Sequence, residues 1–73
     1  MQREPINSSN VRSIGYEEGT LEIEFSQGLV YQYYGVPEEV YENLFKSESI
    51  GSYISKYIKK DFPYKLIGID KLE

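Results

Sequence analysis

TLEIEFSQGLVYQYY, residues 20–34, is the stretch of sequence that decides the fold. In residues 20–25 apolar side chains alternate with glutamates, and this period of two predicts a strand with one buried face. Residues 26–28 are small or polar and end in glycine, which predicts a hairpin turn. Residues 29–34 are rich in tyrosine, leucine and valine and favour a second strand. The stretch therefore predicts an antiparallel hairpin.

The segment before this hairpin adds one more strand. Residues 11–16 have the composition of a strand, and the short, glycine-ended segment 17–19 joins them to the next strand. Together the three strands form an antiparallel meander. Residues 1–9 are polar, contain Pro5 and show no period, so we expect a flexible N-terminal lead or an edge extension of the sheet.

Two helices are expected after the sheet. Pro37 suits the first turn of a helix, and the apolar residues within 40–45 fall on one helical stripe. Within residues 50–58 apolar side chains recur at i, i+3, i+4, i+7 and i+8, which is a complete amphipathic pattern. Asp61-Phe62-Pro63 ends this second helix. Residues 64–69 are a candidate for a short fourth strand.

The order of elements is β-β-β-α-α, which predicts the α+β class. We expect a three-stranded antiparallel meander followed by two helices packed on one face of the sheet. A single domain should cover residues 10–69, with a C-terminal tail at 70–73. Glu22 and Glu24 should lie on the solvent face of the sheet. The expected core combines the apolar stripes of strands and helices: Leu21, Ile23, Phe25, Leu44, Phe45, Tyr53, Ile54 and Ile58.

The composition excludes much of the chemistry that enzymes use. A chain of 73 residues has room for one domain, and it contains neither cysteine nor histidine. Thiolate nucleophiles, zinc sites built from cysteine and histidine, and imidazole acid–base catalysis are therefore excluded. We expect no catalytic activity, no cofactor and no metal. The sequence shows no signal peptide and no membrane-spanning segment, which predicts a cytoplasmic protein.

The net charge of −4 is unevenly distributed along the chain. Residues 1–45 contain two arginines and eight glutamates, whereas residues 46–65 contain five lysines, one glutamate and one aspartate. One interpretation is that the two halves form solvated faces of opposite sign. The other is that the basic second half contacts an anionic partner.

The chain resembles the KTSC domain family through motifs spread over most of its length. These motifs are Ser8-Ser9-Asn10, Gly15-Tyr16, Leu21 with Phe25, Gly28, Tyr31-x-Tyr33, Val36-Pro37, Ser49-x-Gly51 with Tyr53, and Ile58. The family is named for its occurrence at the C-terminus of some lysyl-tRNA synthetases, and it also includes single-domain bacterial and phage-type proteins. The resemblance implies a domain without an assigned activity, for which its association with a synthetase suggests RNA binding. Ser55 stands where the family pattern implies an asparagine.

The candidate residues for nucleic-acid binding are aromatic or basic: Tyr31, Tyr33, Lys56, Lys59, Lys60, Tyr64 and Lys65. Tyr31 and Tyr33 share a sheet face by strand alternation, where they form either an exposed stacking platform or part of the core. The three helix lysines, joined by Lys65 beside Tyr64, either contact phosphates or serve solubility and the helix dipole.

Two functions remain open from the sequence. The first is a small non-catalytic module that binds single-stranded RNA or a tRNA-associated protein through the second helix and the tail. The second is a protein–protein interaction domain of phage or bacterial origin that uses the aromatic face of the sheet. Family membership would not decide between them, because a fold does not fix a function.

Overall fold

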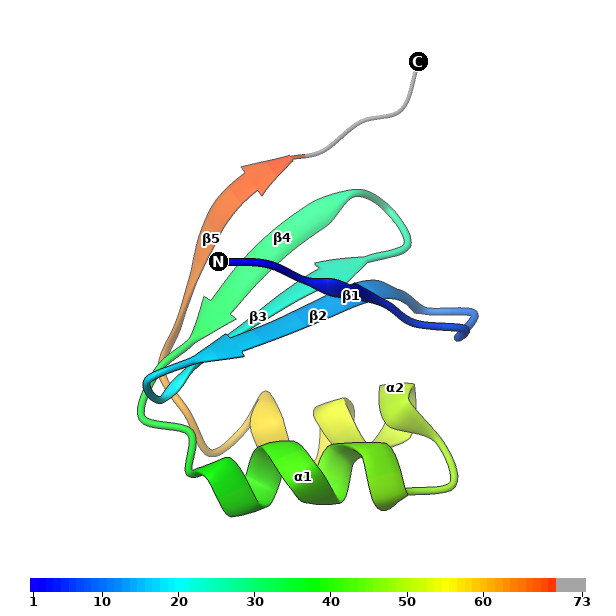
Figure 1. Ribbon diagram of the computed structural model, residues 1–73. Helices are drawn as coiled ribbons and strands as arrows, with labels where there is room; N and C mark the ends of the chain where they lie inside the picture. The colour runs from blue at the N-terminus through cyan, green and yellow to red at the C-terminus, as the bar shows by residue number, and fades with distance from the viewer. Residues whose placement is uncertain (70–73) are drawn as a thin grey trace.

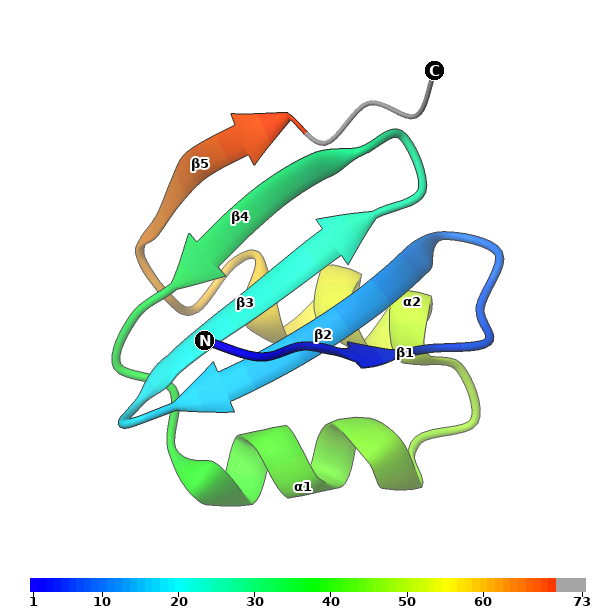
Figure 2. The ribbon, with the colours of Figure 1, turned by 45° about the horizontal axis from the view of Figure 1, so that its top comes forward.

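The hairpin at residues 20–34 supplies the third and fourth strands of a five-stranded antiparallel sheet in the computed structural model, which describes residues 1–69 (Figure 1). The strands follow chain order across the sheet, and the helices lie on one of its faces (Figures 1 and 2). The elements are β1 (Glu4–Pro5), β2 (Val11–Glu17), β3 (Thr20–Phe25), β4 (Leu29–Tyr33), α1 (Glu38–Lys46), α2 (Ile50–Tyr53), the π-helical segment η1 (Ile54–Ile58) and β5 (Tyr64–Ile69). Within residues 1–69, no helix is both long and apolar enough to cross a membrane.

The expected α+β class is confirmed, with both helices on one sheet face. The candidate fourth strand forms as β5, which pairs with β4. The turn between β2 and β3 contains Glu18 and Gly19, whose φ angles are 50° and 82°. Positive φ at both central positions of a two-residue loop gives the twist that adjacent antiparallel strands require. The predicted tail at residues 70–73 lies outside the described residues.

Of the two expectations for residues 1–9, a flexible lead or an edge extension, the structure has the edge extension at Glu4–Pro5. Glu4 pairs with Ile14 and Pro5 with Ser13, so β1 adds an edge strand to the sheet. Proline is tolerated there because an edge strand does not need every backbone N–H. Gly15 permits this approach, since a Cβ atom at that position would lie 2.5 Å from the backbone oxygen of Gln2.

The core lies between the helix-facing side of the sheet and the two helices. Leu21, Ile23, Leu44, Ile54 and Ile58 are buried as expected, and Phe25 and Tyr53 pack half-buried against them. The core also contains four buried residues that the stripes did not include: Val11, Ile14, Tyr33 and Val36.

Phe45 is not a core residue, and that expectation is wrong. Its side chain is 41% exposed, and its ring packs edge-on against Tyr41 with centroids 5.1 Å apart. The preceding residue, Leu44, is fully buried. Successive residues are about 100° apart around a helix, so burial of Leu44 turns Phe45 toward the rim.

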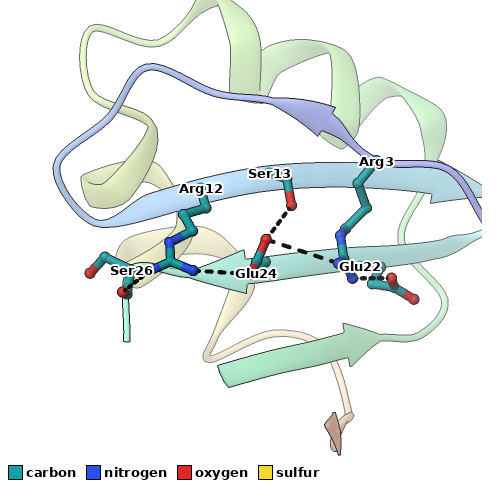
Figure 3. A network of polar contacts seen from close by, with 6 residues as sticks. All are labelled: Arg3, Arg12, Ser13, Glu22, Glu24 and Ser26. Carbon is teal, nitrogen blue, oxygen red and sulfur yellow. Dashed lines mark hydrogen bonds and ion pairs between the residues drawn. The ribbon is translucent and has the colours of Figure 1, made fainter. Parts of the chain in front are cut away.

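Glu22 and Glu24 lie on the sheet face away from the helices, but they are not solvated as expected: each is only 7% exposed. Arg3 forms an ion pair with Glu22, and Arg12 approaches Glu24 at 3.5 Å (Figure 3). The Ser13 hydroxyl donates to Glu24 at 2.9 Å. The long arginine side chains cover the carboxylates, so much of the acidic charge on this face is paired within the sheet.

Candidate aromatic binding cavity

The second helix consists of α2 followed directly by η1, so its geometry changes from α-helical to π-helical part-way along its length. Ser49 caps α2 by accepting a hydrogen bond from the Ser52 N–H at 3.3 Å. In η1 the Lys59 N–H donates to the Ile54 carbonyl at 2.9 Å, which spans five residues rather than the usual four. Ile54 and Ile58 point into the core from this segment. Such π-helical turns are frequent at functional sites.

A cavity of about 460 Å³ lies between this second helix and the sheet. One wall is a helical stripe at i, i+4 and i+8, formed by Gly51, Ser55 and Lys59. The opposite wall comes from the segment before β2, from β3, from the turn after it, and from β4 and β5. The lining residues are Asn10, Phe25, Gln27, Leu29, Tyr31, Tyr33, Gly51, Ser55, Lys59 and Tyr64.

The aromatic rings of the cavity form a connected cluster. The ring of Tyr31 lies 5.8 Å from Phe25 in an edge-on arrangement and 5.6 Å from Tyr64. Tyr33 and Tyr64 are 5.7 Å apart. Tyr33 is buried, Tyr31 is half-buried, and Tyr64 is 59% exposed at the mouth. The cluster therefore runs from the core to the surface and offers ring faces to a ligand.

Lys59 supplies the charge of the cavity. Its ammonium nitrogen lies 5.2 Å from the ring centroid of Phe25, within the range of a cation–π interaction. Among residues 1–69, no carboxylate forms a salt bridge with Lys59, and no acidic residue lines the cavity. The lining is therefore net positive, although the whole chain carries a charge of −4.

Three polar side chains complete the lining: Asn10, Gln27 and Ser55. None of them is hydrogen-bonded through its side chain to another residue in the described part of the chain. They are exposed, so their polar atoms are available to water or to a ligand.

A model of the KTSC domain matches residues 7–62. The chain belongs to this family. An uncharacterised protein of Stutzerimonas stutzeri is 41% identical over 61 residues, which cover 81% of this chain and 86% of that protein. A lysine–tRNA ligase of Nostoc punctiforme is 39% identical over 62 residues, which cover 82% of this chain but 11% of the ligase. The crystal structure of a KTSC domain protein from Yersinia pestis matches with a TM-score of 0.86 and 40% identity, covering 92% of this chain and 97% of that one.

The KTSC family description and the names of these single-domain relatives indicate no catalytic activity. Several motifs that carried the resemblance meet at the cavity: Asn10, the pair Tyr31 and Tyr33, and Gly51 all line it. Ser55, at the position where the family pattern implies an asparagine, also lines it. Segments far apart in the KTSC sequence thus converge on one place.

The structure brings together four of the predicted site residues, Tyr31, Tyr33, Lys59 and Tyr64. Tyr33 is core and Tyr31 is half-buried, so the aromatic pair serves the core and the cavity together.

The other predicted residues do not line the cavity. Lys56 is exposed on another side of η1, and Lys60 is exposed in the turn after η1. Lys65 lies opposite Gln32 in the pairing of β4 with β5. The Gln32 side-chain amide donates a hydrogen bond to Glu22, on the sheet face away from the helices. Because consecutive strand residues point to opposite faces, Lys65 cannot share a surface with Tyr64, and the expected single basic patch is divided.

The sequence interpretation missed several lining residues. The sequence places Gln27 in a turn, Leu29 in a strand and Phe25 in the core, and it marks none of the three as a binding residue. Asn10, Gly51 and Ser55 were noted only as parts of motifs. The sequence did contain a signal for part of this lining. Gly51, Ser55 and Lys59 recur at i, i+4 and i+8 beside the apolar stripe, and they mark a helix face that is neither apolar nor strongly charged.

The phenol of Tyr33 is the most strongly perturbed titratable group of the cavity. Tyr33 is 2% exposed, and its burial raises its pKa from 10.0 to about 12, with smaller contributions from the neighbouring Tyr31 and Tyr64 phenols. The folded protein therefore holds this proton where an unfolded chain would release it.

Stability should fall between pH 10 and pH 12 because of Tyr33. The contribution of the Tyr33 phenol to the free energy of unfolding is complete below pH 10. It is lost as the pH rises toward the pKa of the folded state, because only the unfolded chain releases this proton between pH 10 and pH 12. At pH 11 the loss should be about 1 kcal/mol. Urea unfolding of the parent and of Tyr33→Phe at pH 8 and pH 11 measures it, because the variant lacks the ionisation. An equal loss in both proteins would contradict the assignment.

Proposed function

We propose that this KTSC protein is a non-catalytic, cytoplasmic binding module that takes a base and its phosphate from single-stranded RNA into the aromatic cavity. The observation that carries the proposal is the lining itself, which combines a cluster of aromatic rings, the Lys59 ammonium and free amides without a carboxylate. Sequence-tolerant binding of single strands uses the same combination of ring faces and cations.

The charge distribution permits such binding despite the acidic composition. The carboxylates of Glu22 and Glu24 are paired with arginines on the far face of the sheet. The acidic first turn of α1, Glu38 and Glu39, belongs to the helix that packs on β2 through the stacked rings of Tyr16 and Tyr41. The cavity, by contrast, lies between the second helix and β3–β5. Lys59 can thus attract a phosphate locally, with modest affinity.

The relatives support an RNA partner indirectly. The segment of the Nostoc punctiforme protein that matches this chain belongs to a lysine–tRNA ligase. A domain carried by such an enzyme works beside tRNA, and a single-domain relative could use the same surface on RNA or on a tRNA-associated protein.

Two substitutions test the cavity. Tyr64→Ala removes the exposed ring and should weaken binding of single-stranded RNA by about 5-fold to 150-fold, the range for loss of one stacked base.

Lys59→Glu reverses the charge in the cavity and should weaken binding of single-stranded RNA about tenfold or more. Fluorescence anisotropy with a fluorescein-labelled mixed-sequence RNA octamer measures both effects. Raising the salt concentration should weaken parental binding with a slope of about −0.7 for each phosphate neutralised.

The chain offers matched controls for both variants. Tyr57 is an exposed tyrosine of η1 and Lys56 is the exposed lysine beside it in sequence, and neither lines the cavity. Tyr57→Ala and Lys56→Glu should change the affinity much less than their cavity counterparts. Equal losses in controls and cavity variants would place binding elsewhere, and a parent that binds no single strand would refute the proposal.

One surface favours a second candidate function, a protein–protein interaction. β5 is an edge strand with four exposed large apolar side chains: Tyr64, Leu66, Ile67 and Ile69. An unpaired apolar edge is suited to adding a strand from another polypeptide. This surface becomes the leading candidate if the parent fails to bind RNA.

A further inference from the structure

Asn10 is held by its backbone while its side chain stays free. The Asn10 carbonyl accepts a hydrogen bond from the Ser26 N–H at 3.0 Å, and the Asn10 N–H approaches the Ser8 hydroxyl at 3.4 Å. The side-chain amide has no hydrogen-bond partner in residues 1–69, and it lines the cavity. The fold thus fixes the backbone of Asn10 and leaves both the donor and the acceptor of its side-chain amide available.

Gly51 sets the direction of this amide. A Cβ atom at Gly51 would lie 3.1 Å from the Asn10 side-chain nitrogen, which is closer than ordinary van der Waals contact. The amide therefore packs directly against the backbone of the second helix, at the start of the stripe that forms the cavity wall. A side chain at position 51 would push the amide away from this place.

The standard pairing of an asparagine amide with a base edge is the pairing with adenine. An asparagine side chain presents one acceptor and one donor side by side, and this pair matches the amino group and adjacent ring nitrogen of adenine in a bidentate contact. Arginine or lysine is the usual partner of guanine, but the Lys59 ammonium already lies over the Phe25 ring, where it suits a phosphate.

We propose that Asn10 makes the cavity selective for adenine within single-stranded RNA. This inference rests on the proposed function and adds a specificity to it. A good bidentate contact discriminates against the wrong base by about 5-fold to 150-fold. The stacking rings and Lys59 provide affinity for any base, and the Asn10 amide provides the preference.

The test compares fluorescein-labelled octamers of adenylate, cytidylate and uridylate by fluorescence anisotropy. The parent should bind the adenylate strand at least about fivefold more tightly than the others. Asn10→Leu keeps the size of the side chain but removes its hydrogen-bonding groups, so it should bind all three strands alike, near the parent's affinity for uridylate. Asn43→Leu is the control, because Asn43 is exposed on α1 and does not line the cavity.

A second variant guards against a folding artefact. Gly51→Ala should also reduce the adenylate preference, because its methyl group displaces the amide, while alanine favours the helix. Equal affinity of the parent for the three strands would overturn the inference and leave the proposed function standing, as would an adenylate preference that survives in Asn10→Leu. If the parent binds none of the strands, the inference and the proposed function fail together.

Discussion

Replacing Ile54 by alanine should lower the free energy of unfolding by about 2–5 kcal/mol. Ile54 is 1% exposed and belongs to the core cluster, and its carbonyl accepts the hydrogen bond that defines η1. Truncation leaves a cavity that neighbouring side chains fill only in part, since protein interiors are close-packed. A domain of this size buries only about 60% of its unfolded surface, so this loss is a large share of its stability.

Urea unfolding followed by circular dichroism measures the loss, with Phe45→Ala as the matched control. Phe45 is 41% exposed, so its truncation should cost less than about 1.5 kcal/mol. The contrast separates the observed core from the two apolar helical stripes of the sequence, one of which contains Phe45 and the other Ile54. An Ile54→Ala protein with the urea midpoint of the parent would contradict the core assignment.

The central elements of the fold could be predicted because their patterns are local. Alternation in residues 20–25 indicated which side of β3 faces the helices, and the 3.6-residue period in 50–58 placed Ile54 and Ile58 against that side. Phe45 was misplaced because it lies at the boundary of its helical stripe, where the pattern is compatible with core or rim. Only packing against the sheet decides between them.

Other features depend on contacts between distant segments. β1 is two residues long and has no period of its own, so its pairing with β2 follows from Gly15 and Arg3 rather than from strand propensity. Once residues 64–69 are taken as a strand, alternation along that strand alone places the side chains of Tyr64 and Lys65 on opposite faces of the sheet. The meeting of Asn10 with Gly51 required the tertiary structure.

Removing the Arg3 charge should destabilise the protein by about 2–3 kcal/mol. The carboxylate side chains of Glu22 and Glu24 are each 9% exposed, and Arg3 pairs with the first and lies 3.9 Å from the second. Breaking a buried ion pair by removing one partner costs up to about 5 kcal/mol, and partial exposure of Arg3 reduces that figure. Arg3→Met keeps the apolar stem, so the loss reports on the charge and its hydrogen bond.

The Arg3→Met effect should be concentrated at the edge of the sheet. The Ile6 N–H donates to the Arg12 carbonyl at 2.8 Å, so weaker attachment of β1 should speed hydrogen exchange at Ile6 more than in the central strands. Adding Glu22→Gln should restore part of the stability, because the amide needs no counter-charge. Unchanged exchange at Ile6 would show that the ion pair does not hold β1. No residue of β1 lines the cavity, so RNA binding by the folded variant should match that of the parent, which separates the stability of the sheet edge from the function of the cavity.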